Sequence, residues 1–326
     1  MDLHSVAING VVSAADAARL GIGPYELRRL CALGLLRRMI RGWYAVWPPG
    51  HPLPPWQGKT RWESQHNHHR LLTAALVRSF DGRAAASHGS ALVLHAGRLH
   101  LVDLATAHLC RLSSENTRHR KHAVLHPSIN LPVTEVAGLA CVPPAVAAIQ
   151  VGLIERAGAP AQPIASLVAA DGFLHDRVIN LADLAGAMDV FRGHPGIPAV
   201  RSILAHADGL HESVGETLLA ACLRGLGYHF AAQARHGDYR VDFELVGEPV
   251  IIEFDGLGKY GADLADPTPD DLRRALGREK GREDALRQTG YVVVRITWRD
   301  LHTPKVVFEK VEQARAQARR AHASTH

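Results

Sequence analysis

Apolar and polar residues alternate along two segments, RVDFEL at 240–245 and VIIEFD at 250–255. A period of two predicts β-strands that each bury one face. Gly247-Glu248 lies between the segments, and glycine at the first of two central positions favours a type II′ turn. The pattern therefore predicts a β-hairpin.

The register of this hairpin follows from the turn. Counted outward, three apolar pairs form: Leu245 with Val250, Phe243 with Ile252, and Val241 with Phe254. The same register sets Asp242 opposite Glu253, with β-carbons roughly 5 Å apart, where like charges destabilise the pair. A divalent cation removes this repulsion, and Mg²⁺ is usually held by one or two carboxylates plus water and substrate phosphate. We therefore predict a Mg²⁺ or Mn²⁺ site with Asp242 and Glu253 as metal ligands.

Helical patterns flank the hairpin. Apolar residues recur at helical spacing in 211–227, a segment that ends at Gly227. The charged segment 271–290 predicts a second helix, and YVVVRITW at 291–298 predicts a strand that is buried on both faces. A helix between two strands is the crossover that a parallel pair requires.

Glu216 lies on the apolar stripe of the first of these helices. An isolated charge on a packed face is costly, and a shared cation or a basic partner would relieve that cost. Alternatively, Glu216 follows Ser213 by three residues and is the back-reaching member of a capping box. Both roles can hold together.

The N-terminal pattern predicts two short helices followed by a hairpin. Ser13 can cap the helix AADAARL, and after Gly21-Ile22-Gly23 a second helix begins at Pro24 and closes at Gly34. The stretch LLRRMIRGWYAV at 35–46 alternates and turns at Arg41-Gly42. This order is typical of a winged helix-turn-helix, which we place at residues 1–47.

Basic side chains concentrate on the second helix and the hairpin of this N-terminal domain. They are Arg28, Arg29, Arg37, Arg38 and Arg41. Arginines on a recognition helix and wing neutralise phosphates and reach base edges, so we expect this surface to bind double-stranded DNA. The alternative is a solvated basic helix in a protein-interaction domain.

Composition shifts divide the rest of the chain. Residues 48–62 are rich in Pro, Gly and Trp and predict a linker, 63–205 predict an α+β connector domain, and 206–326 form the C-terminal domain. A length of 326 residues is sufficient for three units, and a formal charge of +5 permits a polyanionic partner without requiring one.

The cysteine and histidine residues do not predict a disulfide or a metal site. The four cysteines lack CxxC spacing, which indicates reduced core residues and, with no signal peptide or long apolar segment, a cytoplasmic protein that does not enter a membrane. The histidines of the connector have no acidic or cysteine partner at ligand spacing, so we expect a solvated surface rather than a metal site. These histidines are His66, His68, His69, His119 and His122. The basic run at 118–122 adds a phosphate contact or is a solvated loop.

Three N-terminal motifs, GVVSAADAARLGI, LRRLCALGLLRR and RGWYAV, resemble the winged helix of the abortive-infection type IV antitoxin family (AbiEi type). The similarity continues more weakly through AAASHGSALVLHA, where Ser87 and His88 open a predicted helix, and through HLVDLAT. Members of that family repress their own promoters and have a cognate toxin. The resemblance implies transcriptional regulation as one role.

Further along, ESVGETLL, YRVDF, VIIEFDG and REKGREDALRQTGYVVVRITW resemble the very-short-patch-repair-like endonuclease domains, over about residues 211 to 302. That resemblance implies a PD-(D/E)XK, restriction-endonuclease-like core of order α-β-β-β-α-β. It implies Asp242 and Glu253 as metal ligands, with Glu216 as an accessory acid. Asp255 stands where many relatives carry a catalytic lysine, and Lys259 or Lys280 could supply that charge from another position. Arg278 and Arg282 are further candidates for phosphate contacts.

Two functions follow from these patterns. The first is a multi-domain α/β protein that binds DNA and hydrolyses its phosphodiester bonds with Mg²⁺ or Mn²⁺. The alternative is an antitoxin-like transcriptional repressor of a type IV toxin-antitoxin system, in which the nuclease fold is catalytically inactive and a toxin protein is the partner.

Overall fold

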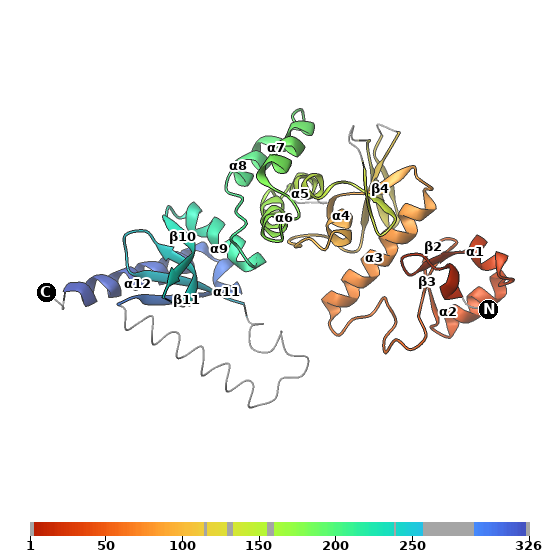
Figure 1. Cartoon of the computed structure of the whole chain (residues 1–326), viewed down its shortest axis with the longest axis horizontal. Coiled ribbons are helices and arrows are strands. Elements are labelled where there is room, and N and C mark those ends of the chain that lie inside the picture. Colours follow the sequence, from red (N-terminus) through yellow and green to blue (C-terminus); the bar gives the residue numbers. More distant parts are fainter. Residues whose placement is uncertain are drawn as a thin grey trace. The chain divides into compact units, whose positions relative to one another are not determined.

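The computed structural model describes residues 3–113, 116–128, 133–154, 160–237, 239–256 and 290–323. The chain forms two compact units, 1–207 and 208–326 (Figure 1). Each is described by itself below. In the described part, no helix is long and apolar enough to cross a bilayer.

The first unit begins with the predicted winged helix. Its elements are η1 (Leu3–Val6), β1 (Val11–Ser13), α1 (Ala14–Arg19), α2 (Pro24–Ala32), β2 (Leu36–Ile40) and β3 (Trp43–Val46). The three strands form one sheet in the order β1-β3-β2. Ser13 caps α1 as expected, because its hydroxyl accepts from Asp16 N at 3.0 Å while Asp16 reaches back to Ser13 N. The helix, turn, helix and wing are therefore confirmed.

A long helix, α3 (Arg61–Ser79), contacts both the winged-helix sheet and the sheet that follows. That second sheet has the order β6-β7-β5-β4-β9-β8. Its strands are β4 (Ala84–Ala86), β5 (Ala107–Arg111), β6 (Arg118–Arg120), β7 (Ala123–His126), β8 (Thr134–Val136) and β9 (Leu139–Cys141). The remaining helices of the unit are α4 (His88–Leu94), α5 (Pro144–Leu153), α6 (Ile164–His175), α7 (Leu181–Val190) and α8 (Ile197–Leu204).

The second unit is a four-stranded sheet with helices packed on it. It contains α9 (Val214–Gly225), β10 (Phe230–His236), β11 (Tyr239–Leu245), β12 (Val250–Asp255), β13 (Val292–Thr297), α11 (Trp298–Leu301) and α12 (Pro304–Ala323). The strand order is β10-β11-β12-β13, with β12 and β13 parallel and the other pairs antiparallel. Apolar residues of α9 and α12 form one buried core with Phe243 and Ile252. The mixed α/β class is thus confirmed, and the parallel pair matches the prediction.

The predicted hairpin register is confirmed, whereas its turn is different. Phe243 pairs with Ile252 as expected. Glu248 N donates to Leu245 O, so Gly247 is the third residue of the turn, with φ +78°. A positive φ at that position is a property of type II turns, which select glycine there, and not of the type II′ turn we predicted.

The predicted face of Val241 is wrong. Phe243 packs into the core shared with α9 and α12, but Val241 packs with Ile251 on the opposite face of the sheet. The neighbouring strand changes face at the same level, since Ala232 contacts the first core and Ala234 the second. Gln233 lies between these alanines with φ +53°, a left-handed backbone conformation that interrupts the alternation of a strand.

Gly215 provides a test of the packing between α9 and the sheet. A β-carbon at this position would overlap the ring of Phe254, so Gly215→Ala should destabilise the second unit by about 1–3 kcal/mol. Gly225→Ala, on the same helix, meets nothing within 4 Å and should cost no stability. Urea unfolding of the two variants measures the difference. Equal stability of both would contradict the close approach of α9 to β12.

Candidate active site and nucleic-acid interface

Asp242 sits where the pairing of β11 and β12 changes. The ladder pairs Glu244 with Ile251 and Phe243 with Ile252. Beyond it, the main-chain NH of Phe254 donates to Asp242 Oδ2 at 2.8 Å. A hydrogen bond to an ionised acceptor is stronger than a neutral one, so the carboxylate is held beside the end of β12, next to Glu253.

Glu253 is buried, with only 6% of its surface exposed, and it lies in the middle of the sheet. In the parallel register its neighbour is Arg295 of β13, whose Nε lies 4.0 Å from Glu253 Oε2. A buried carboxylate requires such a positive or hydrogen-bonding neighbour. We did not identify Arg295 from the sequence, although its alignment with Glu253 follows once VIIEFD and VVVRIT are paired in parallel.

Glu216 is buried at the start of α9 and accepts several hydrogen bonds. Ser213 Oγ donates to its Oε1 at 2.7 Å, and Glu212 N donates to its Oε2 at 2.8 Å. Ser213 Oγ also accepts from Glu216 N, so Ser213 caps the helix, but the Glu216 carboxylate accepts from Glu212 N and not from Ser213 N as in the predicted capping box. Gln233 Nε2 donates to Oε2 of the same carboxylate at 3.1 Å. Gln233 is the residue at which β10 changes face. Its hydrogen bond therefore connects Glu216 to the part of the sheet in which Asp242 lies.

The remaining predicted site residues lie at the end of β12 or outside the described residues. Asp255 is the half-exposed last residue of β12, beside Thr297 of β13. Lys259 and Lys280, as well as Arg278 and Arg282, lie outside the described residues. The described acids do not form a group of three ligand atoms within 4.8 Å.

The five N-terminal arginines are all exposed. Arg28 and Arg29 share one face of α2 with Tyr25, which is 74% exposed and which sequence analysis missed. Arg29 also forms an ion pair with Glu26 at 3.3 Å.

On the wing, a β-bulge between Arg38 and Ile40 interrupts the alternation of β2. Arg37 and Arg38 are therefore both exposed between the buried Leu36 and Met39, and Arg41 follows at the turn. Exposed arginines therefore occur on both the helix and the wing, and Tyr25 adds an aromatic side chain on the helix.

The expectation that the connector histidines form a solvated surface is wrong for His69. This residue is fully buried, with Nδ1 at 2.9 Å from Leu104 O and Nε2 at 2.9 Å from Ser90 Oγ. Since a carbonyl oxygen only accepts, Nδ1 must donate and Nε2 accepts from the serine hydroxyl. His119 and His122 are exposed as expected, while His66 and His68 are half-buried. All four cysteines are free thiols.

Comparison with known proteins bears mainly on the N-terminus. Residues 5–46 match the family model described as "Transcriptional regulator, AbiEi antitoxin". This match confirms the N-terminal resemblance. No curated protein matches the chain.

Among solved structures, the chain is similar to the catalytic domain of the homing endonuclease I-Bth0305I. The similarity has 17% sequence identity and a TM-score of 0.26, and it covers 32% of this chain and 95% of that domain. A TM-score this low does not indicate a shared activity.

Burial of His69 predicts an acid-sensitive first unit. Desolvation lowers the pKa of His69 from 6.5 to about 4, and the nearby His66 and His68 act in the same direction, while the Leu104 carbonyl and Asp103 oppose it. Above pH 6.5 the imidazole is neutral in the folded and unfolded states. As the pH falls from 6.5 to about 4, only the unfolded chain takes up this proton, so the free energy of unfolding should drop by about 3 kcal/mol.

Urea unfolding over this pH range in wild type and in His69→Gln measures this contribution. The variant should lose less stability on acidification, although the other buried histidines keep part of the effect. His119→Gln, at an exposed position, should behave like wild type. An unchanged slope in His69→Gln would show that His69 is not neutral and buried in solution.

Proposed function

We propose that this chain is a DNA-binding protein whose C-terminal unit is a Mg²⁺- or Mn²⁺-dependent endonuclease. The proposal rests above all on the position of Asp242, whose carboxylate is hydrogen-bonded to the main chain one residue beyond Glu253. The two acids come from adjacent strands of one sheet. Such a pair favours a hard cation, because unshielded carboxylates at this spacing repel each other.

The cation would be held by Asp242 and Glu253, with Glu216 as an accessory acid tied in through Gln233. Bound there, Mg²⁺ would polarise the scissile phosphate and lower the pKa of the attacking water. The hydrogen bond from Phe254 orients the Asp242 carboxylate before any cation arrives. This restriction favours a fixed geometry at the reacting phosphate.

Positive charge beside the acids is the second requirement of phosphodiester hydrolysis, because negative charge builds up on the phosphate oxygens. Arg295, 4.0 Å from Glu253, brings one guanidinium to this face of the sheet. Lys259 and Lys280 stay candidates for the same role. Asp255, at the position where many relatives carry lysine, adds a third carboxylate to this end of β12 instead of a cation.

The winged helix would deliver the nuclease to duplex DNA. Exposed arginines on α2 and on the wing suit contacts to phosphates, and Tyr25 adds an aromatic surface on the same helix face. We place this activity in the cytoplasm.

An antitoxin-like transcriptional repressor is the second candidate, and it is favoured by the family match at residues 5–46. In that case the winged helix binds an operator, the C-terminal unit is catalytically silent, and a cognate toxin protein is the partner. Asp255 in place of lysine is compatible with this alternative.

Plasmid nicking distinguishes the two candidates. Wild type should nick supercoiled DNA with Mg²⁺ or Mn²⁺ at low salt, and EDTA should stop the reaction. Asp242→Asn and Glu253→Gln keep the side-chain shape but remove a charge, so each should reduce the rate by about 100-fold or more. Glu244→Gln is the matched control on the same strand, since this residue bonds Tyr291 instead of the acid pair, and its rate should be close to wild type.

The outcomes have separate meanings. Nicking that survives in Asp242→Asn and Glu253→Gln rejects this site. If neither wild type nor any variant nicks DNA while all of them still shift duplex DNA in a gel, the endonuclease proposal is rejected in favour of the repressor.

Arginine substitutions test the DNA-binding surface. Arg28→Ala, Arg38→Ala and Arg41→Ala should each weaken duplex binding about equally across sequences. Each lost phosphate contact should reduce the slope of log affinity against log salt by about 0.9. Arg192→Ala is the control, because Arg192 is exposed outside the winged helix and pairs with Asp189. Fluorescence anisotropy with a labelled duplex at several salt concentrations gives both quantities, and equal salt slopes in all four variants would exclude this surface.

A further inference from the structure

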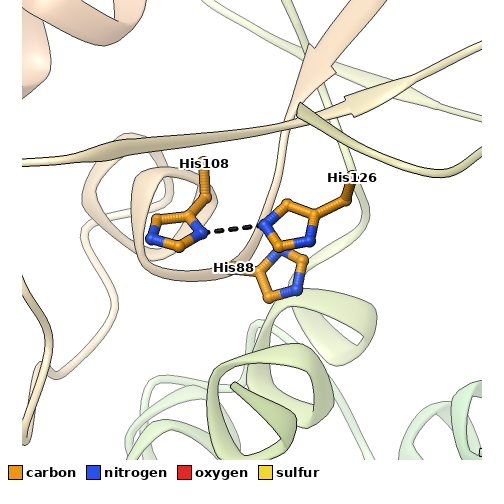
Figure 2. A group of neighbouring side chains, drawn as sticks. All are labelled: His88, His108 and His126. Carbon is orange, nitrogen blue, oxygen red and sulfur yellow. Dashed lines mark hydrogen bonds between the residues drawn. The ribbon is translucent and has the colours of Figure 1, made fainter. Parts of the chain in front are cut away.

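Three histidines that are far apart in the sequence meet in the first unit. One ring nitrogen from each of His88, His108 and His126 lies within 4.8 Å of the others. Figure 2 shows the three rings together, with His108 Nδ1 and His126 Nε2 separated by 2.8 Å. The ring of His88 stacks on that of His126 with centroids 3.9 Å apart.

Two parallel strands provide two of these rings. In the register of β5 and β7, His126 lies beside Cys110, two residues beyond His108. Side chains two residues apart share one face of a strand, so His108 and His126 project on the same side of the sheet. The thiol of Cys110 lies on this face too, but it donates to Pro127 O and is not in the group.

The third ring is held in place by an uncommon backbone conformation. His88 is the first residue of α4 and has φ +52°, a left-handed conformation that is rare outside glycine. Its main-chain NH donates to Gln150 Oε1 at 3.1 Å, and Ser87 Oγ lies 2.9 Å from its Nδ1. A strained backbone conformation of this kind often occurs where a functional side chain needs a particular orientation. The Ser87 hydroxyl can fix the orientation of the His88 ring, as hydrogen-bond partners of metal-binding imidazoles do.

Burial favours the neutral form of two of these imidazoles. Desolvation, aided by the neighbouring histidines, lowers the pKa of His126 to about 3 and that of His88 well below its usual value. A neutral imidazole has one nitrogen with a free lone pair, which is the form that binds metals. His108 Nδ1 and His126 Nε2 share a hydrogen bond, and a metal ion would take its place once the donating ring changes tautomer.

We propose that His88, His108 and His126 bind a borderline divalent transition-metal ion such as Zn²⁺, with a fourth position left for water or another ligand. Zn–N bonds of about 2.0–2.1 Å in tetrahedral geometry correspond to nitrogen separations of about 3.4 Å. The three donor atoms already lie within 4.8 Å, and the His108–His126 pair would have to open by roughly half an ångström. Rotation of the half-buried rings of His108 and His126 would make this change.

Nitrogen donors separate this site from the acid pair of the second unit. Imidazoles favour Zn²⁺ and similar ions, whereas carboxylates with water favour Mg²⁺. The two sites also lie in different compact units. Zinc binding can therefore be measured in the full chain carrying Asp242→Asn and Glu253→Gln, where the acid pair no longer contributes.

The test is Zn²⁺ binding to this metal-free full chain, in competition with a chromophoric chelator. One equivalent should bind, Mg²⁺ should not displace it, and His108→Gln and His126→Gln should each weaken binding by about 100-fold or more. Ser87→Ala, which removes an outer partner, should weaken binding by about 10-fold or more. His122→Gln, at an exposed position just before β7, is the control and should bind like the parent.

Co²⁺ provides a readout that does not depend on the folding of any histidine variant. It should give the strong visible absorption of a four-coordinate nitrogen site, and one equivalent of Zn²⁺ should remove it. The proposal is overturned if the parent chain shows neither this absorption nor one bound Zn²⁺, or if both histidine variants bind as tightly as the parent.

Discussion

The hydrogen bond between Phe254 N and the Asp242 carboxylate replaces a main-chain pairing between β11 and β12. A main-chain NH in the interior of a sheet must find an acceptor, and here an acidic side chain supplies it. The interaction occurs at the level where β10 and β11 both change face, so that Val241 and Ala234 leave the core formed by their neighbours. Gly215 allows α9 to approach Phe254 at the same level, and Glu216 follows directly in the helix. The placement of Asp242, and through Gln233 its proximity to Glu216, is therefore linked to this one irregularity.

The hairpin shows how far the sequence determines the site. Its register was predictable because the position of Gly247-Glu248 sets the pairing, this pairing aligns apolar residues, and a shift of one residue would have exposed the buried face. The face of Val241 was not predictable from alternation, because the break depends on Gln233, a non-glycine residue with a positive φ that no local pattern signals. Arg295 was missed for another reason. Its contact with Glu253 requires the parallel pairing of strands that lie about forty residues apart in the sequence.

The histidines of the first unit show the same limit more strongly. Metal sites are found in sequences through short, regular ligand spacings, but His88, His108 and His126 come from a helix start and two strands. Only the parallel pairing of β5 with β7 and the position of α4 bring them together. We also predicted that the other histidines of this unit form a solvated surface. That prediction failed at His69, because a histidine-rich run on an amphipathic helix does not reveal which ring faces the core. His69 is buried because α3 packs against the sheet that follows it.

Asp255 at the end of β12 cannot serve the role that a lysine at this position would have in the proposed endonuclease. A lysine in β12 could either donate a proton or, when deprotonated, accept one, whereas a guanidinium only donates hydrogen bonds. Arg295 lies beside Glu253 on the adjacent strand and can only offset negative charge. An endonuclease built on these described residues would thus depend on its cation to activate water. A chain that loses that cation would keep the acids, the arginine and the DNA-binding surface, which are the features that a repressor also needs.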